Sequence, residues 1–222
     1  MTLSFNSIIE DARESLSFLK EIGCNNFECS ENSLKIIEKW NFKKLKSEIA
    51  LCNKCKTAQN RKNIVFGEGA FNAKLIFIGD APKIEEEKTD RPLTGEAGIL
   101  LNKIISAMGL SLETVYICNI LKCKTDKNIK NCEEEIKNCL PFLKNQIKKI
   151  NPQIICTLGT EASKALLNTK AGITALRGKF HNYYKIKVMP TFHPAELIEN
   201  ENKKRYVWED MKKVMAIINQ PR

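Results

Sequence analysis

The sequence contains no long apolar segment and no recognisable targeting segment. No stretch of the 222 residues approaches the roughly 20 consecutive apolar residues that a membrane helix requires. The first 18 residues mix Glu10, Asp11 and Glu14 with apolar positions, which fits neither a secretory signal nor an acid-poor transit peptide. We therefore expect a cytoplasmic protein that does not interact with a membrane.

A cytoplasmic location also disfavours disulfide bonds, so the nine cysteines need another explanation. Nine is an odd number, which fits a set of metal ligands with spare buried thiols better than a complete set of disulfides. Clustered cysteines in a reducing compartment most often bind metal or carry out redox chemistry.

Positive charge is in excess. Lys and Arg number 36 against 26 Asp and Glu, which gives a formal net charge of +10. Such an excess attracts polyanions, because bound phosphates release their condensed counterions. The charge favours a nucleic-acid partner, although a generally lysine-rich proteome would produce the same balance without one.

The length suits one full α/β domain with a modest appendage, and the composition, 43% hydrophobic and 28% charged, is that of an ordinary globular protein. Residues 1–48 show a helical apolar period and no residues that suggest catalysis. We predict that they form an N-terminal helical extension and that residues 49–222 form the main domain.

Short apolar runs alternate with helical patterns in the main domain. The runs, which are typical of buried parallel strands, are residues 74–79, 115–120, 154–158 and 186–191. The helical patterns cover residues 100–108, 133–150, 160–167 and 206–218. This alternation predicts a three-layer α/β/α sandwich with a mainly parallel, four-stranded central sheet.

Four residues follow the predicted strands at or just after their ends: Asp80, Asn119, Gly159 and His193. Ligands bind to open parallel sheets at the carboxyl ends of the strands, so these residues are predicted to share one pocket. Taken singly, each has a simpler explanation, since an Asp can cap a helix, an Asn can satisfy a turn and His-Pro can be an ordinary loop.

Two pairs of cysteines have the spacing of metal ligands. Cys52 and Cys55 form a C-x2-C pair, and Cys123 and Cys139 lie 16 positions apart. Four thiolates suit either a 4Fe–4S cluster or an all-cysteine zinc site, and the spacing does not choose between them. The alternative is that Cys123 and Cys139 are core residues, and Cys132 is the nearest competing ligand.

Five motifs occur in a fixed order between about Leu51 and Trp208. They are Phe66–Gly69, Gly79–Gly98 (beginning Gly-Asp-Ala-Pro and ending Pro-Leu-Thr-Gly-Glu-Ala-Gly), Val115–Cys123, Arg177-Gly178 and Thr191–Ala195 with its central His-Pro. In this order and spacing they resemble the motifs of family 4 uracil-DNA glycosylases, the iron–sulfur-containing type. The first 48 residues lie outside the resemblance.

The resemblance implies an enzyme of base excision repair that flips uracil out of DNA and hydrolyses its N-glycosidic bond, leaving an abasic site. It implies a 4Fe–4S cluster on Cys52, Cys55, Cys123 and Cys139. It also implies DNA containing uracil as the partner, and we expect the protein to act as a monomer.

The same resemblance assigns a role to each polar residue at a strand end. Asn119 would hydrogen-bond the pyrimidine edge, and His193 would hydrogen-bond uracil O2 and stabilise the negative charge that develops there. Asp80 or Glu86 would stabilise the cationic sugar and orient the attacking water. Substrate contacts are further expected from Ala81, Leu93 and Asn128.

The sequence departs from the family at two of these positions. Leu93 stands where the family usually has a Phe that stacks on the flipped base, and the lost stacking corresponds to about 1–3 kcal/mol. Lys83 replaces a Gly, so its side chain would contact phosphate or crowd the site. The loop 124–131 lacks the histidine-bearing insertion of relatives that trap uracil-DNA covalently, which argues against that behaviour.

Contacts to the DNA backbone are harder to predict. The segment 200–206 is the best candidate for a loop at the duplex. Lys122, Arg177, Lys179 and Lys187 are further candidates, with a solvated face as the alternative.

Two other functions compete with the glycosylase interpretation. Leu93 and Lys83 raise the possibility of a weakly active or inactive member of the fold that binds DNA or a base. The cysteines alone would equally suit a zinc or redox-sensing protein.

Overall fold

The computed structural model describes residues 42–125 and 128–219. The predicted helical segments before residue 42, and the polar connection between them with Cys24 and Cys29, lie outside the described residues. In the described part, no helix has the length and apolar character needed to cross a membrane.

The centre of the fold is a six-stranded sheet in the order β1-β3-β2-β4-β6-β5. The four predicted strands are present, and their pairings β3–β2, β2–β4 and β4–β6 are all parallel. Their bounds are β2 Leu75–Gly79, β3 Val115–Asn119, β4 Ile154–Leu158 and β6 Ile186–Thr191.

The prediction of four strands was wrong in number, because an antiparallel strand is added at each edge. These strands are β1 Glu68–Gly69, which pairs with β3, and β5 His181–Tyr183, which pairs with β6. With two and three residues they are too short to show an alternating apolar pattern.

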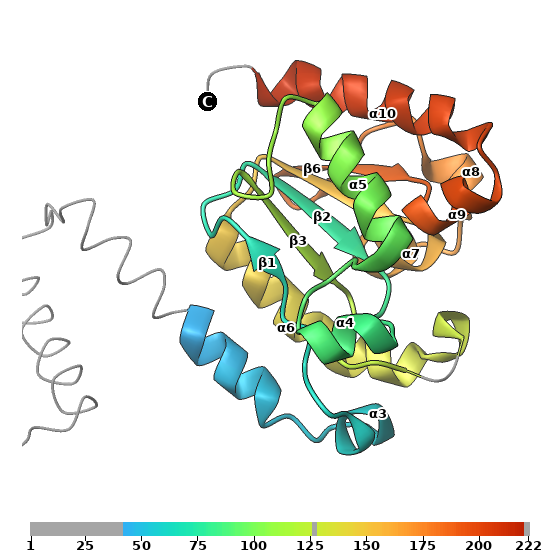
Figure 1. The fold of residues 1–222 in the computed structure, drawn as a ribbon. Helices are drawn as coiled ribbons and strands as arrows, with labels where there is room; N and C mark the ends of the chain where they lie inside the picture. Colours follow the sequence, from blue (N-terminus) through green and yellow to red (C-terminus); the bar gives the residue numbers. More distant parts are fainter. Residues whose placement is uncertain (1–41, 126–127, 220–222) are drawn as a thin grey trace, which may run out of the picture. The chain divides into compact units, whose positions relative to one another are not determined.

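Side chains of the central strands alternate between two apolar cores, one on each face of the sheet. In β2, Ile76 and Ile78 belong to the core formed with α6 (Glu133–Ile150) and α7 (Thr160–Leu167). Leu75 and Phe77 belong to the core formed with α5 (Gly95–Ala107) and α10 (Lys203–Ile218). The sheet is therefore covered on both faces, as the three-layer prediction required, and Figure 1 shows the layers.

The longer helices match the predicted patterns with extended ends. They are α5 Gly95–Ala107, α6 Glu133–Ile150, α7 Thr160–Leu167 and α10 Lys203–Ile218. The shorter ones are α3 Lys56–Asn60, α4 Ile84–Thr89, a 3-10 turn at Ile129–Asn131, α8 Ile173–Leu176 and α9 Pro194–Glu199.

A helix over residues 42–50 belongs to the same compact unit, which runs from Glu38 to Arg222. Its Phe42, Leu45 and Ile49 are buried in one of the two cores. The Phe42 ring stacks on Phe71, with 4.1 Å between the ring centroids. The predicted domain boundary at residue 48 falls inside this helix.

Candidate active site

The parallel strands all finish at the same end of the sheet, and their carboxyl ends bring the predicted residues together there. Gly79, the last residue of β2, is in register with Asn119 at the end of β3. Leu158, the last residue of β4, is in register with Thr191 at the end of β6. Asp80 and Gly159 follow directly and His193 follows after one residue, so residues more than 110 positions apart become neighbours.

A cavity of ≈ 290 Å³ opens at the carboxyl ends of the strands and is large enough for one pyrimidine base. Five of the residues predicted to act on substrate line it: Asp80, Ala81, Glu86, Leu93 and His193. Lining residues that the sequence reasoning did not single out are Pro82, Thr94, Ala97, Thr125, Ile129 and Ala195. Most of these stand inside or beside the quoted motifs, which was the available signal for them.

A second, larger hollow of ≈ 670 Å³ lies at the other end of the strands, beside Lys74 and Leu75 at the start of β2. None of the polar residues predicted at strand ends lines it. Its size therefore does not make it the better candidate.

Gly159 separates the carboxylate from the imidazole. A Cβ atom placed on this glycine would lie 3.3 Å from the Cβ of His193 and 3.5 Å from Oδ2 of Asp80. Its backbone has φ +95°, a conformation that side chains rarely adopt. Glycine thus lets Asp80 and His193 face the cavity from adjacent positions.

Asp80 is held in a largely buried position. Its Oδ1 accepts a hydrogen bond of 2.7 Å from the N–H of Ala162, near the start of α7. Burial raises the pKa of Asp80 to about 7, against this opposing hydrogen bond, and the nearby Glu161 and Glu196 raise it further. The side chain is therefore divided between its acid and carboxylate forms near neutral pH.

His193 is the N-cap of α9 and presents one defined ring nitrogen to the cavity. Its Nδ1 accepts a hydrogen bond of 3.1 Å from the N–H of Ala195. Burial, assisted by the charge of Lys83, lowers the pKa of His193 to about 4. The neutral ring with an occupied Nδ1 carries its proton on Nε2, which is a hydrogen-bond donor.

Asn119 lies behind the cavity wall and does not line it. Its side chain is 1% exposed, and Nδ2 donates to Glu86 Oε2 at 3.0 Å. A Cβ on Gly79 would lie 2.5 Å from Oδ1 of Asn119, so only glycine at that position admits the amide. Asn119 is thus one hydrogen bond away from the cavity, through Glu86.

Glu86 connects this amide to the neighbouring backbone. Burial raises its pKa, and this effect is opposed by hydrogen bonds with the backbone of Leu93 and the side chain of Asn119. Leu93 itself has φ +50°, an unusual conformation for a residue other than glycine. The Glu86 carboxyl group therefore holds both the amide of Asn119 and the backbone of Leu93.

Two other predicted positions sit at the periphery. Lys83 is exposed at the mouth of the cavity and lines it. Asn128 is exposed and is not among the lining residues, although its carbonyl oxygen accepts hydrogen bonds from the N–H of Asn131 and the thiol of Cys132.

The four predicted ligand cysteines gather on the α6 side of the sheet. Burial raises the pKa of Cys139 to about 11, and the neighbouring Cys123 and Cys52 raise it further. Burial also raises the pKa of Cys123, to which Cys55 and Cys52 contribute. The fully buried Cys132, the competing ligand, instead forms a hydrogen bond with the Asn128 carbonyl.

These sulfurs do not form a compact site for a single ion. Among the described residues, no three or more His, Cys, Asp or Glu side chains are grouped so that they could hold one metal ion. A four-iron cluster is a larger body, and its four thiolates stand further apart than those around one zinc.

Two cations adjoin these cysteines. Arg61 donates to the Cys123 Sγ at 3.6 Å and to the Cys52 carbonyl at 2.7 Å, and it also bonds the Ala50 carbonyl. Lys122 is 0% exposed. The suggestion that Lys122 reaches phosphate was therefore wrong, because its side chain turns into the interior.

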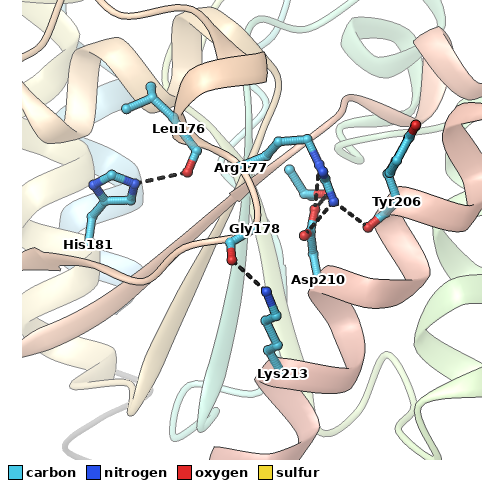
Figure 2. Close-up of polar contacts among 8 residues, drawn as sticks. Leu176, Arg177, Gly178, His181, Tyr206, Asp210 and Lys213 are labelled. Atoms are coloured by element: carbon cyan, nitrogen blue, oxygen red, sulfur yellow. Dashed lines mark hydrogen bonds and ion pairs between the residues drawn. The ribbon is translucent and has the colours of Figure 1, made fainter.

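Arg177 is also unavailable to phosphate, because it pairs with a buried carboxylate. Figure 2 shows its guanidinium forming two hydrogen bonds to Asp210, at 2.7 and 3.1 Å, and one to the Tyr206 carbonyl. Asp210 in turn accepts a hydrogen bond of 2.7 Å from Thr191 Oγ1. This network anchors the end of β6, two residues before His193.

The segment 200–206 is likewise mostly committed to the fold. Helix α10 begins at Lys203, whose ammonium pairs with Glu196 at 2.9 Å. Lys204 pairs with Glu201. Only the turn at 200–202 remains a loop.

Arg177→Met should lower the free energy of unfolding by about 3–5 kcal/mol, because it leaves the carboxylate of Asp210 buried without its counter-charge. The free energy is measured by urea denaturation. Lys213→Met is the matched control, since it removes an exposed hydrogen bond to the Gly178 carbonyl and only a weaker electrostatic interaction with Asp210, and it should change stability by less than about 1 kcal/mol. Equal effects of the two variants would contradict the assignment.

Comparisons with known proteins agree with the motifs. The sequence profile of the uracil DNA glycosylase superfamily matches residues 66–212. Three proteins named type-4 uracil-DNA glycosylase are similar to the chain over most of their length. The one from Sulfurisphaera tokodaii is 39% identical over 190 residues, covering 82% of this chain and 86% of that protein. Those from Saccharolobus solfataricus (40%; 81% and 87% covered) and Thermotoga maritima (39%; 75% and 89% covered) are similar to the same extent.

Proposed function

This chain belongs to the uracil DNA glycosylase superfamily, and we propose that the cavity at the carboxyl ends of its parallel strands binds a uracil base extruded from DNA. The activity is that of a uracil-DNA glycosylase, a DNA-repair hydrolase that cuts the N-glycosidic bond. The observation that carries the assignment of the site is the meeting of Asp80, Glu86 and His193 around one cavity of the size of a base.

The chemistry follows from the protonation states of the site. As the bond between the sugar C1′ and uracil N1 breaks, its electron pair goes to the base, and the charge spreads to O2. The Nε2–H of neutral His193 donates to O2 and stabilises that anion. The Asp80 carboxylate stabilises the cationic sugar and accepts the proton that water loses as its oxygen adds to C1′. The uracil anion takes up one proton from solvent, and Asp80 later returns its proton to solvent, so the products are uracil and an abasic sugar.

Recognition of the base is assigned to Asn119. In this structure the amide lies behind Glu86, to which Nδ2 donates one N–H, so the proposal requires Glu86 to move aside when the base enters. The second N–H of Nδ2 then donates to uracil O4, and Oδ1 accepts from the N3–H. Cytosine has the opposite pattern at these two positions, so it cannot complete the pair. Leu93 supplies apolar contact without a ring face, while Ala81 and Asn128 complete the substrate contacts in this proposal.

The cofactor of this proposal is a 4Fe–4S cluster held by Cys52, Cys55, Cys123 and Cys139. Such a cluster with four thiolates is anionic and holds together the segments that supply its ligands. The donors fit that group, because Arg61 donates to the Cys123 sulfur and the fully buried ammonium of Lys122 interacts electrostatically with Cys139. The cluster takes no part in turnover.

The remaining parts of the proposal concern partners and setting. The net charge of +10 suits DNA as the partner, and the protein acts as a monomer in the cytoplasm. The N-terminal extension in this proposal ends before the helix over residues 42–50, which belongs to the compact unit, and it lies outside the region matched by the superfamily.

A single-turnover assay tests the proposal. Anaerobically purified protein is mixed in excess with an oligonucleotide that carries one uracil, and abasic sites are revealed by alkaline cleavage. We expect cleavage at the uracil and none in the matched oligonucleotide with thymine. Tight binding without release would instead support the inactive DNA-binding alternative.

A further inference from the structure

Lys122 is a buried cation that the reaction does not use. Its side chain is 0% exposed, and its ammonium donates to the Asn119 carbonyl at 2.7 Å. Within the part of the chain that the structure describes, no carboxylate lies within ion-pair distance of it. An ammonium buried with a single neutral acceptor is strongly unfavourable, so a negative charge must compensate it.

The only anionic group that the proposed function places nearby is the cysteine-bound cluster. The backbone N–H of Lys122 bonds the sulfur of Cys139, and the next residue along the chain is Cys123. Cys118 also feels the ammonium, but this thiol is fully buried in a strand and is not one of the ligands. The cluster thiolates are thus the natural counter-charge for Lys122.

Lys122 also contacts Asn119, a residue of the proposed uracil site. Asn119 and Lys122 flank a bend at the end of β3, where the N–H groups of Ile120 and Leu121 donate to the carbonyls of Gly79 and Asp80. The Lys122 ammonium holds the Asn119 carbonyl across this bend. Lys122 is itself fixed, because its own carbonyl accepts a hydrogen bond of 2.7 Å from the N–H of Val65.

We propose that Lys122 is a positioning residue, held by the negative charge of the cluster, that fixes the backbone of Asn119 and so couples the cluster to uracil recognition. The inference rests on the proposed cluster and on the proposed role of Asn119. It assigns the cluster a local effect on the base pocket in addition to holding segments together.

The test compares Lys122→Met, which has similar length and no charge, with the holoprotein and with Lys103→Met, a control at an exposed position of α5. The first readout is the rate at which a ferrous chelator bleaches the cluster absorption near 400 nm. Loss of a group that supports the ligands should raise this rate about 10–100-fold in Lys122→Met and leave it unchanged in the control.

The second readout is base preference in binding. Oligonucleotides carrying 2′-fluoro-2′-deoxyuridine, which resists hydrolysis, or the matched cytidine analogue are titrated against each protein. The preference for uracil over cytosine should fall about tenfold in Lys122→Met, as expected when a supporting partner is lost. A merely structural role would weaken both complexes alike.

The outcomes separate the inference from the function on which it rests. Wild-type protein without iron would refute the proposed cofactor. Wild-type protein with iron, together with an unchanged bleaching rate or base preference in Lys122→Met, would refute only the role of Lys122. If Lys122→Met does not fold, Lys122→Gln replaces it, with the same expected increase in bleaching. Failure of both to fold, while cluster-depleted wild type stays folded by circular dichroism, would also refute the coupling.

Discussion

His193→Ala and Asn119→Ala should each lower single-turnover release of uracil by about 10²–10³-fold, the loss typical of removing one donor to a developing oxyanion. His193 loses its Nε2–H toward uracil O2, and Asn119 loses the amide that reads the base edge. The rate is measured with protein in excess over a uracil oligonucleotide, so that product release does not limit it.

The other histidine provides the matched control for this experiment. His181 bonds the Leu176 carbonyl at 2.9 Å, away from the cavity (Figure 2), and His181→Ala should keep the wild-type rate. Both active-site variants should retain the wild-type circular dichroism spectrum. A variant with wild-type release would remove that residue from the mechanism.

Asp80→Asn should abolish most uracil release and at the same time stabilise the protein above pH 7. The substitution removes the charge while keeping an oxygen that can accept from the Ala162 N–H. In the wild type, the rate should rise with pH through about 7, since the active carboxylate form appears there. His193 stays neutral above its pKa of about 4, so its titration leaves the profile between pH 5 and 8 unchanged.

The gain in stability follows from the direction of the same pKa shift. The pKa of Asp80 is raised in the folded state from 3.8 to about 7, so the folded state binds this proton more tightly than the unfolded state. That contribution to stability is complete below pH 3.8 and is lost as the pH rises through 7. Asn has no proton to lose, so Asp80→Asn should gain roughly 2–4 kcal/mol at pH 8.

Urea denaturation at pH 5 and pH 8 measures this difference. The control is Asp90→Asn, which removes a partly exposed carboxylate that pairs with Lys46 outside the cavity. It should change neither the pH dependence of stability nor the rate. An Asp80→Asn variant that is active, or that is equally destabilised at both pH values, would place the catalytic carboxylate elsewhere, with Glu86 the next candidate.

The sequence predicted the parts of the fold that carry strong local patterns. The four central strands are continuous apolar runs and could be located almost to the residue. The edge strands β1 and β5 could not, because strands of two and three residues carry no periodic signal and form only by pairing with a neighbour.

Two cations show that local sequence patterns also fail to predict the burial of single side chains. Lys122 and Arg177 read as surface residues, yet one turns inward beside the cysteines and the other pairs with Asp210. Arg177 pairs with Asp210, 33 positions further along the chain, and Lys122 donates to the Asn119 carbonyl, 3 positions before it. No local pattern distinguishes a buried lysine from a solvated one.

The sequence alone predicted which chemical groups form the site and the order of the motifs that carry them. It also predicted that the strand ends would bring these groups together. Only the folded chain decided that Asp80 titrates near neutrality, that His193 is neutral with its proton on Nε2, and that Asn119 stands behind Glu86. The reason is physical: these properties depend on desolvation and on hydrogen-bond partners from distant segments, which exist only once the strands have been brought side by side.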